Sequence, residues 1–236
     1  MKTKMDDSRT VALLGADAAA KLKDSAVAVF GVGGVGSFAA EALARAGVGT
    51  LILVDNDVVK PSNCNRQLVA LSSTIGKKKV GVMKERILDI NPQANVVAYD
   101  AFYDGQTSDE LLSGPIDFVV DAIDSLRSKE LLILECRRRG IEIISSMGAG
   151  NKLYPERFCI VDLFATKCDP IAKILRKRLR DAGIDKLPVV CSDELPQKTQ
   201  LAEDGKHVPA SISFVPPVCG LLMAGYVVRR IIGVEQ

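Results

Sequence analysis

The chain has little of several things: one histidine, no tryptophan, and six cysteines that form no Cys-x-x-Cys pair. The ligand spacing of a structural zinc site is therefore missing. Because the cysteines stand singly, they do not suit a disulfide framework, and reduced thiols in a cytoplasmic protein are the simpler interpretation. The one histidine, His207, lies in a polar segment. We expect a surface position for it and no catalytic role.

An excess of one charge sign is also absent, since 31 Lys and Arg stand against 29 Asp and Glu, a net charge of +2. This excludes nucleic-acid binding through bulk charge alone but not through a local basic face. The first ten residues contain no apolar stretch of the kind found in signal peptides. The longest apolar run, Val215 to Val228, is interrupted by two prolines and a glycine and is shorter than the roughly 20 residues of a membrane span. We expect a buried helix there and no stable membrane insertion.

Short charge-free runs alternate with helical stretches over the first 150 residues. Strands of this kind, separated by helices, are typical of a parallel sheet covered on both faces. The pattern predicts an α/β fold, a Rossmann-like, doubly wound and mostly parallel sheet. The expected strands are Ala26–Phe30, Thr50–Val54, Val96–Tyr99, Phe118–Asp121 and Glu142–Ser145, and the expected helices are Gly34–Ala46, Gly76–Ile90 and Arg127–Arg139.

The pattern changes after Gly150. Two strand-like runs, Phe158–Phe164 and Ser211–Val215, flank a helix at Pro170–Ala182 and a polar segment at Pro196–Pro209. We expect the polar segment to be a mobile loop. The sequence thus predicts a single domain over residues 1–236, in which a nucleotide-binding core at 1–150 carries a C-terminal extension of strands and helices at 151–236.

A glycine-rich segment follows the first expected strand and opens a helix; its glycines are Gly31, Gly33, Gly34 and Gly36. Glycines permit a tight turn here and let backbone N–H groups approach a phosphate at the helix N-terminus. Asp55, at the end of the second strand, can accept hydrogen bonds from ribose hydroxyls. These features alone predict a nucleotide site, with a nicotinamide-dependent oxidoreductase as the default and a nucleotide-sensing binding module as a further alternative.

A dense polar and basic set then favours a triphosphate over a nicotinamide. Hydride transfer needs a dry, mostly apolar site, whereas a triphosphate needs cations and amide donors. Arg66 can bond phosphate oxygens in a bidentate manner and Lys79 can add a point charge, although an exposed helix lysine is the plainer interpretation of Lys79 taken alone. The set comprises Asp57, Ser62, Asn63, Asn65, Arg66, Gln67 and Lys79.

Asp121 ends the fourth expected strand, and a second carboxylate, Asp124, follows just after it. Ligands bind at the carboxyl ends of parallel strands, and a carboxylate that faces phosphates there suits Mg²⁺. Alternatively, Asp124 or Ser125 caps the next helix. We favour Asp124 as the Mg²⁺ ligand with Ser125 beside the nucleotide, and leave Asp121 open between a ligand and a structural role.

Together these residues resemble the adenylating, ThiF-like superfamily, which includes the ubiquitin-activating enzymes and bacterial enzymes that act on sulphur-carrier proteins. The motifs occur in order: Arg9, Gly31–Gly36, Asp55–Asp57, Ser62–Gln67, Lys79 and Asp124. Within the superfamily the chain is most similar to the tRNA threonylcarbamoyladenosine dehydratases. The segments that carry this similarity are Val35–Arg45, Asn63–Gln67, Ile87–Pro92, Val120–Ser125, Ser145–Gly150, Asp169–Pro170 and Ser213–Pro217.

The resemblance implies an enzyme that uses ATP and Mg²⁺ to adenylate the carboxylate of a threonylcarbamoyl group on tRNA, beside the anticodon, and to close that group into a ring with loss of water. It implies that Gly34 and its neighbours hold the ATP phosphates, that Asp55 holds the ribose, and that Asp124 binds Mg²⁺. It also implies that Lys79 stabilises charge in the transition state. The residues implied to contact the triphosphate are Asn63, Arg66 and Gln67. Arg9 resembles an arginine that reaches into the partner subunit's site, which implies a homodimer. Residues 151–236 are then expected to bind substrate and to form the dimer.

The alternative within the superfamily is adenylation of the C-terminus of a ubiquitin-like or sulphur-carrier protein, and a sulphur-transfer protein is kept as a candidate partner. Relatives of that kind usually carry two Cys-x-x-Cys pairs, which this chain lacks. No catalytic cysteine is implied, and we expect Cys191 to be a small buried apolar residue.

A tRNA partner must meet cations, and the expected helix at Pro170–Ala182 offers five of them opposite an apolar face of Ile171, Ile174, Leu175 and Leu179. We favour phosphate contact over a generic solvated face. Aromatic residues are scarce, so extensive base stacking is not expected. The cations are Lys173, Arg176, Lys177, Arg178 and Arg180.

Overall fold

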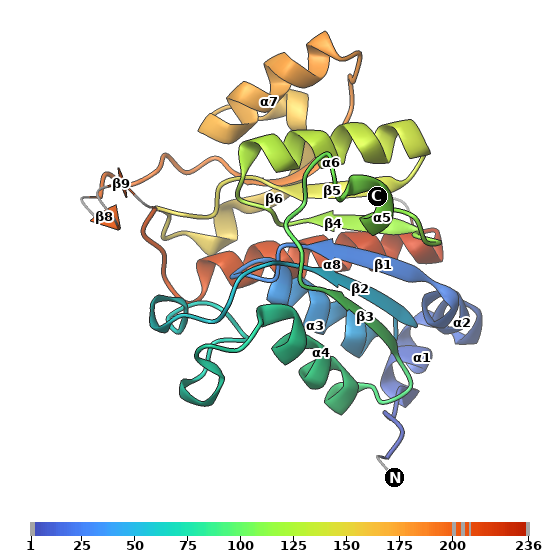
Figure 1. Cartoon of the computed structure of the whole chain (residues 1–236). Coiled ribbons are helices and arrows are strands. Elements are labelled where there is room, and N and C mark those ends of the chain that lie inside the picture. The colour runs from blue at the N-terminus through green and yellow to red at the C-terminus, as the bar shows by residue number, and fades with distance from the viewer. Residues whose placement is uncertain (1–2, 200–201, 204–205, 208, 235–236) are drawn as a thin grey trace.

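A computed structural model describes residues 3–199, 202–203, 206–207 and 209–234. Its centre is a seven-stranded sheet with the strand order β3-β2-β1-β4-β5-β7-β6 (Figure 1). Neighbouring strands run parallel, except that β6 and β7 are antiparallel. The predicted Rossmann-like, mostly parallel α/β fold is confirmed.

The strands are β1 (Ala26–Phe30), β2 (Thr50–Val54), β3 (Asn95–Tyr99), β4 (Phe118–Asp121), β5 (Glu142–Ser146), β6 (Phe158–Asp162) and β7 (Pro188–Ser192). The helices are α1 (Ser8–Leu14), α2 (Ala16–Asp24), α3 (Gly36–Ala46), α4 (Lys79–Ile90), α5 (Ser108–Leu111), α6 (Leu126–Arg139), α7 (Pro170–Asp181) and α8 (Val215–Ile232). Helices α1, α2 and α5 were not among the expected elements.

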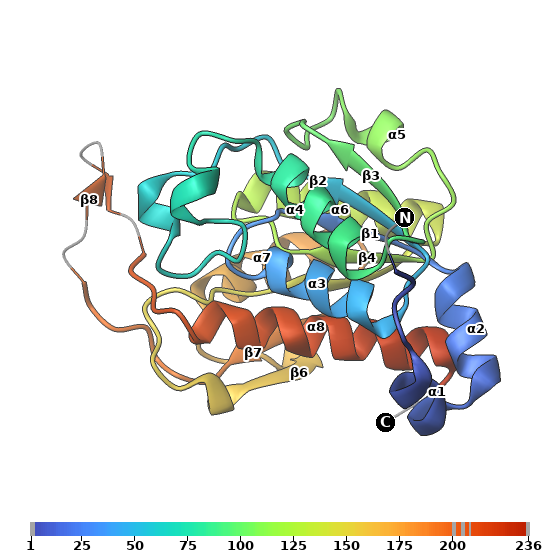
Figure 2. The ribbon, with the colours of Figure 1, turned by 90° about the horizontal axis from the view of Figure 1, so that it is seen from below.

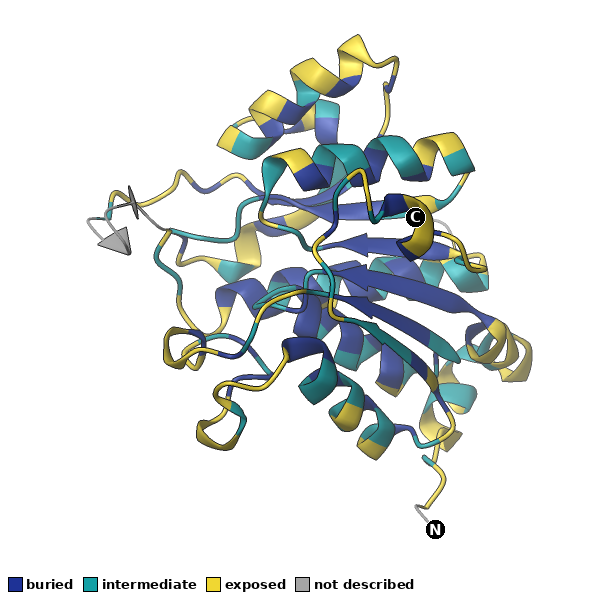
Figure 3. Ribbon diagram, viewed as in Figure 1, coloured by how far each residue is buried: buried dark blue, intermediate teal, exposed yellow. Residues whose placement is uncertain are grey.

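Helices cover both faces of the sheet, which is why its central strands are apolar throughout. Every residue of β1 is buried, and its side chains alternate between two cores. Val27 and Val29 pack with α3, α4 and α8, whereas Ala28 and Phe30 pack with α5 and α6. Colouring by burial shows the sheet as a dark layer between half-exposed helices (Figure 3).

The expected strand at Ser211–Val215 is wrong. Ile212, Ser213 and Phe214 are exposed and pair with no strand in the described part of the chain, and Val215 already begins α8. The following prolines suit the first turn of a helix, where their missing N–H groups leave no bond unmade. The position between β5 and β6 belongs instead to β7, which sequence reasoning missed.

The polar segment Pro196–Pro209 contains two short strands, β8 (Ala202–Glu203) and β9 (Lys206–His207), which pair in antiparallel fashion. The expected mobility of this segment falls partly on 200–201, 204–205 and 208, which lie outside the described residues, as does the side chain of His207. Both expectations stay predictions.

The expected buried helix near the end of the sequence is α8, which runs beside α3 (Figure 2). By length and composition alone α8 could cross a membrane. In the molecule it packs closely on α3, because a Cβ at Gly220 would lie only 2.3 Å from the carbonyl oxygen of Val35. The buried face also contains Val215, Cys219, Met223, Ala224 and Val227, so α8 serves as a core helix here.

Candidate nucleotide site

The glycine loop between β1 and α3 is so tight that side chains have no room at two positions. Gly31 has φ +87°, and a Cβ there would lie 2.6 Å from the carbonyl oxygen of Ala122. A Cβ on Gly36 would lie 1.8 Å from the carbonyl oxygen of Gly31. The loop therefore exposes backbone to an approaching phosphate at the N-terminus of α3.

Asp55, just after β2, ties this loop to the next strand. One carboxylate oxygen accepts the N–H of Val32 at 2.7 Å and the other accepts the N–H of Asp57 at 2.8 Å. Burial raises the pKa of Asp55, and the positive charge of Lys79 opposes that rise. Each oxygen keeps a lone pair that a ribose hydroxyl can use.

The segment Ser62–Gln67, which is predicted to bind the triphosphate, packs directly on the glycine loop. A Cβ on Gly34 would lie 3.4 Å from Cγ of Arg66, and one on Gly33 would lie 3.7 Å from Nε2 of Gln67. Ser37 joins the two segments, because its hydroxyl donates to the carbonyl of Gly33 at 2.5 Å and accepts the N–H of Leu68 at 3.3 Å. The structure thus brings together motifs that are far apart in the sequence.

Arg66 is half-buried, and one nitrogen of its guanidinium, Nη1, makes the hydrogen bonds that hold the group. Its Nη1 donates to the carbonyl of Ser62 at 3.0 Å and to Oδ1 of Asn65 at 2.8 Å. Within the described residues, Nε and Nη2 donate no hydrogen bond. A guanidinium held in this way keeps donors for a phosphate.

Two amide side chains lie buried beside Arg66. Oδ1 of Asn63 accepts the N–H of Lys60 at 3.0 Å, which orders the turn. Oε1 of Gln67 is buried and has no hydrogen-bond partner in the described part of the chain. A buried acceptor left unpaired is costly, so it points to a ligand donor beside the glycine loop.

Lys79, the first residue of α4, is 4% exposed. Its Nζ lies 2.7 Å from Oδ2 of Asp57, a carboxylate that remains largely exposed. The plainer interpretation, an exposed helix lysine, is therefore wrong. The cation is instead aimed at the same edge as Asp55 and the glycine loop.

The two carboxylates at the carboxyl end of β4 have different environments. Asp121 is fully buried and pairs with Lys129 of α6 at 2.8 Å, so its role is structural. The cap of α6 is Ser125, whose hydroxyl accepts the N–H of Ser128 at 3.5 Å. Asp124 is exposed and makes no hydrogen bond within the described residues, which leaves its carboxylate free for a ligand.

Arg9 is not brought to this site within one chain. It is exposed on α1, and neighbouring residues of α1 line a hollow with Gly47, Gly49, Asn91 and Gln93, which precede β2 and β3. That is the amino end of the sheet, opposite the glycine loop.

The basic helix is α7, and its apolar face is only partly as expected. Leu175 and Leu179 are buried, but Ile174 is 42% exposed. Three of the five cations have partners: Arg176 donates to the carbonyl of Thr166 at 2.8 Å, Arg178 pairs with Glu130 of α6 at 2.6 Å, and Arg180 lies 5.4 Å from the ring centre of Phe164. Lys173 and Lys177 are exposed and make no described polar contact.

A buried ion pair that sequence reasoning did not single out lies beneath α7. Nζ of Lys152 lies 3.5 Å from Oδ2 of Asp169 and donates to the carbonyl of Gly148 at 2.7 Å. Asp169 also accepts the N–H groups of Gly148 and Ala172, both at 3.0 Å. The Asp-Pro pair at the start of α7 was a usable signal, since it marks an N-cap followed by proline.

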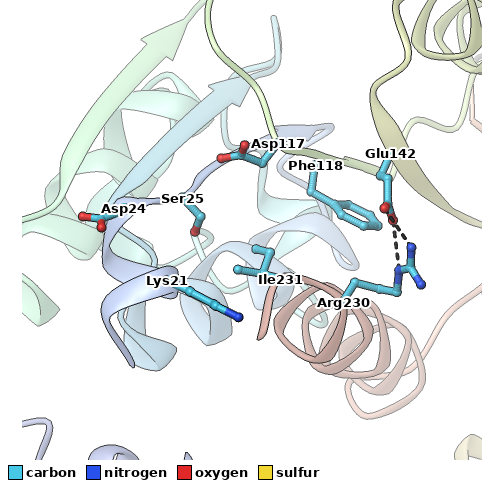
Figure 4. Close-up of a pocket in the computed structure, with 8 residues that line it drawn as sticks. All are labelled: Lys21, Asp24, Ser25, Asp117, Phe118, Glu142, Arg230 and Ile231. Carbon is cyan, nitrogen blue, oxygen red and sulfur yellow. Dashed lines mark hydrogen bonds and ion pairs between the residues drawn. The ribbon is translucent and has the colours of Figure 1, made fainter. Parts of the chain in front are cut away.

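An open hollow of about 390 Å³ lies at the amino end of the sheet, away from the glycine loop (Figure 4). Arg230 and Glu142 form an ion pair at its wall with a 2.8 Å contact. It contains none of the predicted nucleotide residues. Its lining is Lys21, Asp24, Ser25, Asp117, Phe118, Glu142, Arg230 and Ile231.

Comparison with known proteins agrees with this geometry. The ThiF family model matches residues 6–236. The chain is 47% identical to the tRNA threonylcarbamoyladenosine dehydratase of Bacillus subtilis, over 95% of this chain and 94% of that one. It is similar to the solved structure of the E. coli tRNA N6-threonylcarbamoyladenosine dehydratase in complex with AMP, with a TM-score of 0.89 and 36% identity over 96% of this chain and 93% of that chain. For the same enzyme in complex with ATP the TM-score is 0.88 at 35% identity, with the same coverage. The chain therefore belongs to the ThiF family.

Proposed function

We propose that this chain is an ATP-dependent tRNA threonylcarbamoyladenosine dehydratase. The observation that carries the proposal is the joining of the glycine loop, the unused donors of Arg66 and the buried Lys79 at one edge of the sheet. Such a site suits a triphosphate. The close similarity over nearly the whole chain to the enzyme of Bacillus subtilis supports the substrate assignment.

The proposed chemistry has two steps. The substrate carboxylate attacks the α-phosphorus of ATP, which forms an acyl-adenylate and releases pyrophosphate. The carbamoyl group of the same substrate then attacks the activated carbonyl, closes the ring, loses a proton and releases AMP. The net change to the nucleoside is the loss of one water. Positioning and charge stabilisation by Arg66 and Lys79 supply the main protein contribution.

Mg²⁺ fits this site only together with the nucleotide. Among the described residues no group of three His, Cys, Asp or Glu side chains could hold a metal ion. A single free carboxylate, that of Asp124, is nevertheless what Mg²⁺ uses when phosphates and water complete its coordination. Bound there, the ion would offset negative charge on the phosphates.

The tRNA is proposed to meet α7, where Lys173 and Lys177 have no described partner and face solvent. A cytoplasmic location is proposed together with this substrate. The test is to incubate the protein with ATP, Mg²⁺ and threonylcarbamoylated tRNA and to measure nucleoside mass. A loss of one water is expected, and an unchanged mass, or turnover that requires a small protein ending in Gly-Gly, contradicts the proposal.

A homodimer is also proposed, with Arg9 completing the partner's site. This is supported by the position of Arg9 at the far end of the sheet from its own glycine loop. We expect Arg9→Ala to lower turnover without dissociating the dimer. Mixing Arg9→Ala with Asp124→Ala subunits should restore about one working site in each mixed dimer. Activity that stays at the level of the separate variants would refute the action in trans.

A further inference from the structure

Asn151 is the one described residue other than glycine with a positive φ, at 59°. Asparagine tolerates this conformation better than most residues. Its N–H donates to the carbonyl of Ala210 at 2.7 Å, and its Oδ1 accepts the N–H of Ala210, also at 2.7 Å. Its own carbonyl accepts the N–H of Gln197 at 2.6 Å. One residue therefore holds together both ends of the polar segment.

The neighbouring glycine keeps this junction compact. A Cβ on Gly150 would lie 2.6 Å from Cβ of Pro209 and 3.3 Å from the carbonyl oxygen of Ala210. Residues 150–151 and 209–210 are thus packed backbone against backbone, and any side chain on Gly150 must displace the polar segment.

From Ala210 a short series of hydrogen bonds leads to the nucleotide site. The next residue, Ser211, accepts through its carbonyl the Nδ2 of Asn65 at 3.0 Å. The other end of the same amide, Oδ1 of Asn65, accepts Nη1 of Arg66 at 2.8 Å. The stem of Arg66 lies against Gly34 in the glycine loop.

We infer that Asn151 is a positioning residue for Arg66: it fixes the chain at Ala210 and Ser211, which orients Asn65, and Asn65 holds the guanidinium over the glycine loop. The inference rests on the proposed function in that Arg66 is taken to bond the triphosphate. A guanidinium held in place before binding loses less conformational entropy when the phosphate arrives, so its orientation contributes to affinity.

Two substitutions at Asn151 separate the hydrogen bond from the backbone conformation. Asn151→Gly keeps the positive φ and removes the Oδ1 acceptor, whereas Asn151→Asp keeps an acceptor at the same place. Calorimetry with ATP alone should show affinity weakened about 5- to 10-fold for Asn151→Gly, which loses the acceptor of both the Ala210 N–H and the Thr199 hydroxyl, and changed less than about twofold for Asn151→Asp. Equal affinity for Asn151→Gly and wild type, or equal losses in both variants, overturns the inference.

A double-mutant cycle with Arg66→Ala tests the route of the effect. If Asn151 acts through Arg66, Asn151→Gly causes no further loss of ATP affinity once the guanidinium is gone. A merely structural role would weaken binding by the same factor in both backgrounds, and that result also overturns the inference.

Gly150→Ala provides a second variant should Asn151→Gly fail to fold. It pushes Pro209 from the other side and should cause a loss of ATP affinity that likewise disappears in the Arg66→Ala background. These measurements need no tRNA. Wild-type protein that binds ATP but leaves tRNA unchanged therefore contradicts the proposed dehydratase, while unaltered ATP affinity in both variants contradicts the role of Asn151.

Discussion

Two parts of the molecule handle buried charge differently. Beneath α7, Lys152 and Asp169 are each 1% exposed at the side chain and have hydrogen bonds that lie inside the protein. At the glycine loop, Lys79 is also buried, with 6% of its side chain exposed, but its carboxylate partner Asp57 is 58% exposed. Nearby, Gln67 keeps an unpaired buried oxygen and Arg66 keeps donors without an acceptor among the described residues. We call the first network closed, because its charged groups pair with each other inside the protein. We call the second network open, because some of its polar groups have no partner among the described residues.

A closed network can stabilise and orient a fold, but it has nothing left to offer a ligand. An open network costs stability until a ligand completes it. The two parts should therefore respond in opposite ways to substitution: the closed one in the free energy of unfolding, and the open one in turnover.

The largest effect on stability is expected in the closed network. Asp169→Ala leaves the buried cation of Lys152 unpaired and removes the cap of α7, so the free energy of unfolding should fall by about 3–5 kcal/mol. Urea denaturation measures it. The matched control is Asp193→Ala, which breaks the solvent-exposed pair with Arg157 and should leave the midpoint unchanged. Similar midpoints for both variants would remove the distinction between the two networks.

The largest effect on activity is expected at Asp124, the exposed carboxylate proposed to hold Mg²⁺ beside the open network. Asp124→Ala should reduce Mg²⁺-dependent turnover by about 10²- to 10³-fold, because charge on the phosphates is no longer offset. Its urea midpoint should equal that of wild type, since Asp124 is exposed and unpaired within the described residues. Asp185→Ala, another exposed carboxylate, is the control. Wild-type activity in Asp124→Ala would remove this residue from the metal site.

A smaller effect is expected on α7, above the closed network. Lys173→Ala with Lys177→Ala should reduce the slope of log affinity for tRNA against log salt by about 1–2, the change expected when two phosphate contacts are lost. Filter binding over a range of salt concentrations measures this. Lys21→Ala, at the amino end of the sheet, should leave the slope unchanged. An unaltered slope in the double variant would show that α7 is an ordinary solvated face.

The smallest effect concerns the thiols. Burial raises the pKa of Cys191 to about 11 and that of Cys219 to about 12. Both are therefore neutral at pH 8, and iodoacetamide should label the exposed Cys64 and Cys159 first, as peptide mass mapping will show. The unfolded chain loses these protons at lower pH than the folded one, so stability should fall as pH rises from about 9 towards 11. Rapid labelling of Cys191 in the folded protein would contradict its burial.

Sequence patterns located β1 and β2 to the residue, because strands buried on both faces are uninterrupted apolar runs. They missed β7, since the apolar run inside Pro188–Ser192 is only Val189 to Cys191, and the segment pairs as a strand with β5 and β6 in the folded chain. They misassigned Ser211–Val215 for the converse reason: the composition suits a strand, but no strand lies beside it.

The residue types of the site could be predicted, but their burial could not. The sequence does not distinguish Lys77, Lys78 and Lys79 from one another. In the structure α4 begins at Lys79, and it is this lysine that turns inward to pair with Asp57. The role of Asp121 had to be left open, because its partner Lys129 comes from the following helix. Asn151 gave no signal, since its role depends on segments that meet only in the folded chain.

The close approach of α8 to the glycine loop has a consequence for biosynthesis. A Cβ on Gly34 would lie 3.1 Å from Cβ of Pro216, and Gly220 meets the backbone at Val35, so the first βα turn rests on a helix made some 180 residues later. While the ribosome is still translating α8, the nascent chain holds a loop with no support beneath it. Nucleotide binding should therefore begin only after α8 has emerged and docked.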